Sequence, residues 1–171
     1  MIDLWMVDLD GVMNSSNLRD ALVPSGAAAH TAEGWAAWHE AHTTEAVNEE
    51  MIDRLNAAHK RGIRILFCSM RCTQYADTTH QQLTSAGLDF DPVLWLRSPW
   101  DDTPPPAAKV FALLNACAMF TALGEAVQIT FIDDSTANIM AINASADVAA
   151  VQAGGDVSVL PVLFPVFKGV E

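Results

Sequence analysis

Leu4-Trp-Met-Val-Asp8-Leu-Asp10-Gly11 joins a short apolar run to two aspartates and a glycine. The apolar run predicts a buried strand that ends at Asp8. Aspartates at the end of a strand often do no more than cap a turn with their side chains. The meaning of this stretch therefore depends on whether polar residues also follow the later strands of the chain.

The rest of the chain alternates between strand-like and helix-like segments. Further strands are expected at residues 63–68, 92–96, 126–132 and 146–151, and helices at 45–61, 73–86, 107–123 and 135–144. Strands that alternate with helices indicate a parallel sheet with helices on both faces. The apolar tail, which contains Pro161 and Pro165, is assigned to no element.

Composition and charge restrict the possible functions. With 171 residues, 51% of them hydrophobic and 18% charged, the chain is expected to be globular rather than disordered. The net charge of −12 disfavours binding to long duplex nucleic acid, but it allows a small phosphorylated substrate, because a bound dication reverses the local sign. There is no membrane-spanning apolar run and the N-terminus lacks the basic start of a signal peptide, so a cytoplasmic protein is expected.

Polar residues follow four of the expected strands. They are Asp8 and Asp10 after the first, Ser69 and Arg71 after the second, Lys109 beyond the loop after the third, and Asp133 and Asp134 after the fourth. The carboxyl ends of parallel strands share one edge of a sheet, where α/β proteins bind ligands. Carboxylates gathered there repel one another, and Mg²⁺, which prefers oxygen ligands, relieves that repulsion. Lysine and serine side chains nearby suit phosphate oxygens, as does a helix N-terminus.

These residues resemble the motifs of the haloacid dehalogenase-like superfamily. Asp8-Leu-Asp10-Gly11-Val-Met13-Asn14 resembles its first motif, and Ser69, Lys109 and Asp133-Asp134 resemble the second, third and fourth, in the same order. The resemblance covers roughly residues 4–152. Met13 departs from it, since many members carry a smaller or branched apolar residue there, and little consequence is expected.

The resemblance implies a phosphatase mechanism. Asp8 would attack phosphorus and form an aspartyl-phosphate, while Asp10 would protonate the leaving oxygen and then deprotonate water. Magnesium would be held by Asp8 and the Asp10 carbonyl. The remaining implied roles are magnesium ligation by Asp133 and, through water, Asp134, and phosphoryl binding by Ser69 and Lys109.

A narrower resemblance is to the phosphatase domain of phage-type polynucleotide kinases. It rests on Trp35-x-x-Trp38, Val47-Asn48, Cys68-Ser-Met-Arg71 and Leu94-Trp-Leu-Arg97. It implies that Arg71 and Arg97 contact the phosphate or nucleotide of the substrate. The kinase half has no counterpart, because the sequence contains no G-x-x-x-x-G-K-[ST] loop.

Each of these residues also has a structural interpretation. Ser69 can cap a helix, Lys109 can be solvated, and Arg71 and Arg97 can form surface ion pairs. Tryptophans three apart, such as Trp35 and Trp38, more often pack in a core than stack on bases. None of the five histidines has a partner at metal-ligand spacing, so all five are expected at the surface.

We therefore expect one domain over residues 1–171, with a doubly wound Rossmann-like α/β fold and strand order 5-4-1-2-3. Residues 14–46 are expected to form a small helical cap insertion that leaves the site open to bulky substrates. The expected function is magnesium-dependent hydrolysis of a phosphomonoester, on a nucleotide or a polynucleotide 3′-phosphate end. The alternatives are a small-metabolite phosphatase and a catalytically silent binding module.

Overall fold

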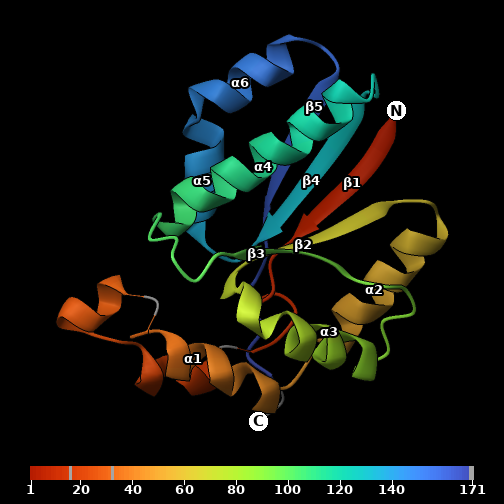
Figure 1. Cartoon of the computed structure of the whole chain (residues 1–171). Coiled ribbons are helices and arrows are strands. Elements are labelled where there is room, and N and C mark those ends of the chain that lie inside the picture. Colours follow the sequence, from red (N-terminus) through yellow and green to blue (C-terminus); the bar gives the residue numbers. More distant parts are fainter. Residues whose placement is uncertain (16, 32, 170–171) are drawn as a thin grey trace.

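A computed structural model of the protein describes residues 1–15, 17–31 and 33–169, and it has a five-stranded parallel sheet (Figure 1). The strands are β1 (Ile2–Val7), β2 (Arg64–Cys72), β3 (Val93–Arg97), β4 (Val127–Asp133) and β5 (Val157–Leu163). Their order is β3-β2-β1-β4-β5, with β1 in the centre. The expected order, read from the opposite edge, is confirmed, although the fifth strand is a different segment.

Helices cover both faces of the sheet, as expected of a doubly wound fold (Figure 1). One face carries α2 (Glu49–Lys60) and α3 (Ala76–Ser85), and the other carries α4 (Pro105–Ala122), α5 (Thr136–Ala144) and α6 (Ala146–Ala153). A hydrophobic core lies on each face of the sheet, and neighbouring residues of β1 contribute to both. Met6 packs in the core on the α4 side, and Val7 packs in the core on the α2 side. A central parallel strand needs apolar residues on both faces for this reason.

The segment expected to be the fifth strand is a helix. Residues 146–151 belong to α6, and the Ser145 hydroxyl caps that helix by accepting the Val148 N–H at 3.3 Å. An N-cap serine followed by alanines favours a helix over a strand. The apolar tail instead supplies β5, which pairs with β4 in a parallel register from Val157 to Leu163.

The edge strand β5 presents alternate donors outwards. The Phe164 N–H points towards β4 and donates to the Asp133 carbonyl at 2.9 Å. The backbone N–H groups of odd-numbered residues of β5 therefore point away from β4, towards solvent. One of them, Val159, donates its N–H to Oε1 of Gln152 at 2.8 Å. The next, Pro161, has no N–H to donate.

The insertion between β1 and α2 is made of short helices. They are η1 (Asn17–Leu22), η2 (Gly26–His30), α1 (Ala36–Glu40) and η3 (Ala41–Thr44), where η denotes a 3₁₀ helix. In Figure 1 this segment lies beyond the carboxyl ends of the strands, and a capping role for residues 14–46 stays a prediction. Among the described residues, no helix combines the length and the apolar character needed to cross a membrane.

Candidate active site

The loop after β1 places two aspartates at the carboxyl edge of the sheet. The Asp8 N–H donates to the Ile132 carbonyl at 2.9 Å, which aligns β1 with β4. Gly11 follows with a φ of +91°, a conformation that side chains disfavour. A Cβ at Gly11 would lie 2.1 Å from Oδ2 of Asp134. Glycine is therefore required both for the turn and for the approach of Asp134.

Three carboxylates from two strand ends meet at this edge. Oxygens of Asp8, Asp133 and Asp134 all lie within 4.8 Å of one another. Nζ of Lys109, from the second turn of α4, lies 2.8 Å from Oδ1 of Asp8 and 3.1 Å from Oδ2 of Asp133. The same ammonium group donates to the carbonyl of Cys68 on β2. The structure thus brings together four of the predicted site residues.

Hydrogen bonds from α5 orient Asp133. The Ser135 N–H donates to its Oδ1 at 2.9 Å, and Nδ2 of Asn138 lies 3.0 and 3.1 Å from its two oxygens. These hydrogen bonds hold the carboxylate in one orientation. Asn138 did not figure among the predicted site residues, although its place five residues after Asp133 is visible in the sequence.

The positive charge near the three carboxylates is too small to balance their negative charge. Burial raises the pKa of Asp8 to about 8, with Lys109 opposing the rise and Asp133 adding to it. Burial, with a contribution from Asp133, likewise raises the pKa of Asp134 to about 6. Lys109 remains charged, because Asp8 and Asp133 outweigh its burial and raise its pKa. One ammonium does not neutralise three carboxylates, so this set of oxygen donors fits a divalent cation such as Mg²⁺.

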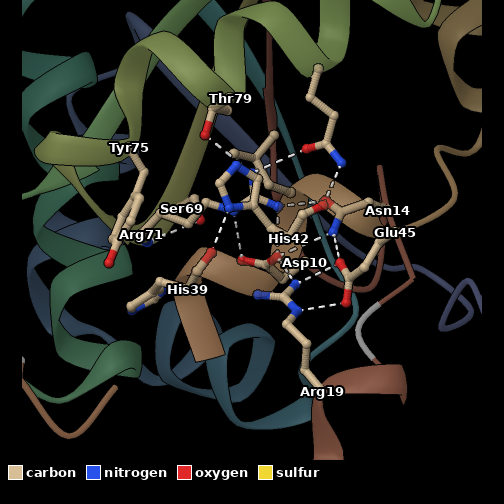
Figure 2. A network of polar contacts seen from close by, with 12 residues as sticks. Asp10, Asn14, Arg19, His39, His42, Glu45, Ser69, Arg71, Tyr75 and Thr79 are labelled. Carbon is tan, nitrogen blue, oxygen red and sulfur yellow. Dashed lines mark hydrogen bonds and ion pairs between the residues drawn. The ribbon is translucent and has the colours of Figure 1, made fainter. Parts of the chain in front are cut away.

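Asp10 lies among cations instead, as Figure 2 shows. Arg71 contacts both of its oxygens, with Nε 3.2 Å from Oδ2 and Nη2 2.7 Å from Oδ1. Nη2 of Arg19 also donates to Oδ1. Burial opposes ionisation of Asp10, but Arg71 and Arg19 outweigh burial and hold its pKa well below the usual range.

Arg71 is fully buried, and protein groups occupy its whole guanidinium. The group has five N–H donors, and Asp10 accepts two of them. The others go to Oδ1 of Asn14 at 2.7 Å, Oγ1 of Thr79 at 3.1 Å and Oε1 of Gln82 at 3.4 Å. A substrate contact would have to displace one of these partners. In this structure Arg71 therefore holds Asp10, and its predicted contact with the substrate stays a prediction.

The course of β2 explains this placement. The pairing of β2 with β3 shifts register between Ser69 and Cys72, and Arg71 lies within that irregularity. Such irregularities redirect side chains. Ser69 is buried, and its Oγ accepts the Arg71 N–H at 3.2 Å. Its predicted role in phosphoryl binding stays a prediction.

Sequence reasoning missed the second arginine of this network. Arg19 of η1 pairs with Glu45, at 2.6 Å to Oε1 and 2.9 Å to Oε2. It also donates to the Trp38 carbonyl at 2.9 Å and stacks over the Trp38 ring at 3.8 Å. Asn14 links Glu45 to Arg71 (Figure 2). A charged pair 26 residues apart has no local pattern, and the neighbouring residues in the sequence do not mark Arg19 or Glu45 as buried.

The remaining predictions concern the rim of the site. Arg97 lies apart from the carboxylates, where its Nε donates to the Asp101 carbonyl. The expectation that all five histidines are at the surface is wrong for His39 and His42, which are buried. Burial lowers the pKa of each of these two to about 4, so both are neutral at pH 7.

Comparison with known proteins adds no assignment. No model of a known protein family matches the chain, and no curated protein matches it. Any functional conclusion therefore depends on the geometry of the site itself.

Proposed function

We propose that the protein is a magnesium-dependent phosphomonoester hydrolase that acts through an aspartyl-phosphate. The observation that carries this proposal is that Asp8, Asp133 and Asp134 meet around Lys109. Asp10, two residues after Asp8, is held separately by arginines. Hydrolysis through a carboxylate nucleophile needs one group of residues that binds the phosphoryl charge and a separate residue that transfers protons. The mechanism agrees with that implied by the resemblance to the haloacid dehalogenase-like superfamily.

In the first step, a carboxylate oxygen of Asp8 attacks phosphorus, and the bond from phosphorus to the leaving oxygen breaks. The leaving oxygen takes a proton from Asp10. In the second step, a water oxygen attacks the same phosphorus and its proton passes to Asp10. The bond from phosphorus to the Asp8 oxygen breaks, which restores the Asp8 carboxylate and releases inorganic phosphate. Lys109 offsets the charge of the transferred group. Magnesium held by Asp8, Asp133, the Asp10 carbonyl and, through water, Asp134 would stabilise phosphoryl charge when bound.

The two arginines suit Asp10 to the second step more than to the first. They favour its ionised form, which accepts a proton from water. As general acid, Asp10 must instead be protonated when the leaving oxygen departs. An incoming phosphate competes for the same guanidinium groups and so weakens their hold on Asp10. We propose that this competition raises the pKa of Asp10 once substrate is present.

We propose a nucleotide or a polynucleotide 3′-phosphate end as the substrate. The helices that the structure describes in the insertion are all short, which suits a bulky leaving group better than a fully enclosed metabolite. The terminal nitrogens of Arg97 are available for substrate contact, whereas a contact with Arg71 has to displace one of its present partners. The net charge of −12 favours a nucleotide or a short end over long duplex.

A release assay for inorganic phosphate tests the proposal. The panel contains nucleoside monophosphates, 3′- and 5′-phosphorylated oligonucleotides and sugar phosphates, each with Mg²⁺ and with a chelator. Magnesium-dependent release is expected, highest for nucleotides or 3′-phosphorylated ends. Higher release from sugar phosphates would favour the small-metabolite alternative. Folded protein that releases no phosphate from any substrate, with Mg²⁺, Mn²⁺ or Co²⁺, would instead indicate a silent binding module.

A further inference from the structure

A cavity of about 620 Å³ lies beside the carboxylate site and has no part in the proposed phosphoryl chemistry. Its walls come from η2 and α1 of the insertion, from the ends of β2 and β3, and from residues 102–105, which lead into the first turn of α4. This volume is within the range of small-molecule sites. The lining is mostly apolar with a few polar side chains, and it includes Trp35, Trp38, His39 and Arg97.

Two tryptophans with fixed orientations form one wall. The indole N–H of Trp35 donates to the Ala29 carbonyl at 3.0 Å, which anchors its ring. Trp35 and Trp38 meet edge to face, with ring centroids 5.5 Å apart and planes at 85°. Arg19 covers one face of Trp38, so Trp35 is the better candidate to stack on a ligand. A held aromatic ring stacks on a planar group with little further loss of side-chain freedom.

Polar groups with unused hydrogen-bonding capacity also line the cavity. His39 is only 6% exposed, and its Nδ1 has no hydrogen-bond partner among the described residues. A buried polar atom without a partner is costly and often marks a missing ligand or water. The terminal nitrogens of Arg97 likewise form no hydrogen bond or ion pair within the part of the chain that the structure describes.

The cavity adjoins the acid/base side of the site through three connections. Trp38 lies between the cavity and Arg19, which pairs with Asp10. Met70 and Cys72 line the cavity on either side of Arg71, the other partner of Asp10. Pro105 lines it one helical turn before Lys109. A group that leaves next to Asp10 therefore has this cavity beside it.

We propose that this cavity binds the nucleobase of a nucleotide substrate, stacked on Trp35, with the edge of the base meeting His39 and Arg97. The inference depends on the proposed function, since it assigns the leaving group of that reaction. A base fits this lining better than a sugar does. A base offers a large flat face and a few polar atoms at its edge, whereas a sugar carries a hydroxyl on most of its carbons and needs more polar partners than the lining supplies.

Calorimetric titration with unphosphorylated nucleosides tests the cavity without any catalysis. Adenosine, guanosine, cytidine and uridine are each titrated into the wild-type protein, with ribose as the control ligand. At least one nucleoside is expected to bind, and ribose is not. Trp35→Ala should weaken nucleoside binding by about 5- to 150-fold, the range of base–aromatic stacking. Trp35→Phe keeps a ring and should retain most of the affinity, which separates a lost stack from a damaged fold.

The matched control is Trp100→Ala, because Trp100 is 90% exposed and does not line the cavity. Its nucleoside affinity should stay within about twofold of wild type. Failure of all four nucleosides to bind, or equal losses in Trp35→Ala and Trp100→Ala, would overturn the base-binding assignment. Phosphate release from other esters would still support the phosphatase in that case. Conversely, nucleoside binding without phosphate release would support the cavity and refute only the enzyme proposal.

Discussion

Asp8 and Asp10 are two residues apart on the same loop, yet their surroundings differ in sign. Asp8 faces Asp133 and Asp134 with a single lysine, and burial raises its pKa to about 8. Asp10 faces two arginines that hold its pKa well below the usual range. The residue type is the same, so the difference comes entirely from distant parts of the chain. In this site the role of each carboxylate is set by what the fold brings to it.

The contrast also separates two ways of compensating buried charge. The network around Asp10 contains its own cations, so it is complete within the protein. The cluster around Asp8 has one cation for three carboxylates, which fits the added Mg²⁺ that we propose. Substitutions in the two halves should therefore differ in how they affect activity, stability and the response to magnesium.

The largest effect is expected from removing the proposed nucleophile, Asp8. Asp8→Asn should lower kcat by about 10⁴-fold or more, the scale seen when a nucleophile is lost, because an amide does not form the covalent intermediate. The measurement is phosphate release with Mg²⁺, combined with circular dichroism to establish the fold. Asp53→Asn, on the exposed face of α2, is the control and should keep full activity. Near wild-type turnover in folded Asp8→Asn protein would eliminate the covalent mechanism.

A smaller effect is expected at Asp10. Asp10→Asn should reduce kcat by about 10²–10⁴-fold, the usual contribution of a general acid–base group. The loss should be least for p-nitrophenyl phosphate, whose leaving group needs little protonation, and greatest for an alkyl phosphate. Rates for the two esters are compared in wild type and variant. Equal losses would contradict the assignment of Asp10 as the general acid.

The complete network around Asp10 should matter for stability whether or not magnesium is present. Arg71→Met leaves Asp10, Asn14 and Thr79 short of donors, and we expect a loss of about 3–5 kcal/mol in the free energy of unfolding. Arg54→Met removes an arginine from an exposed pair with Glu50 and should cost at most about 0.5 kcal/mol. Urea denaturation measures both. Similar costs for the two variants would mean that the buried network contributes little.

A double-variant cycle sharpens this test. If Arg71 and Asp10 stabilise each other, Arg71→Met combined with Asp10→Asn should cost less than the sum of the two single changes, by about 0.5–3 kcal/mol. Strict additivity would show that the two side chains act independently.

The smallest effect is expected from Mg²⁺ binding to the cluster of Asp8, Asp133 and Asp134, measured as a gain in stability. Mg²⁺ at about 100 times its dissociation constant should stabilise the wild-type protein by about 2.7 kcal/mol, and a chelator should remove that gain. Thermal denaturation with and without Mg²⁺ measures it. Asp133→Asn should lose most of the gain, whereas Arg54→Met should keep it. An unchanged gain in Asp133→Asn would place any bound ion elsewhere.

The sequence predicts most of the fold because its strands and helices carry local signals. The apolar run before Asp8 and the alternation after it indicate the parallel sheet, and the order of the strands is confirmed. The exception is residues 146–151, where alanine and valine suit both a strand and a helix, and the Ser145 cap decides for α6. The true edge strand was missed because Pro161 interrupts its apolar pattern.

Part of the site can also be predicted from the sequence, and part cannot. Strand ends of a parallel sheet converge, so the meeting of Asp8, Asp133 and Asp134 follows from the positions of the strands. The surroundings of Asp10 do not follow, because Arg19 and Glu45 come from an insertion with no regular pattern. The inward turn of Arg71 depends on a local register shift that the letters of β2 do not reveal.

The outer edge of β5 has a consequence for the behaviour of the protein at high concentration. A free strand edge is a template on which another chain can add a strand, and such additions lead to aggregation. Here the Gln152 side chain already accepts the Val159 N–H, and Pro161 supplies no donor to an incoming strand. Two successive outward positions thus offer no free N–H to an incoming strand. The sheet can expose an apolar edge strand and still resist growing into a larger intermolecular sheet.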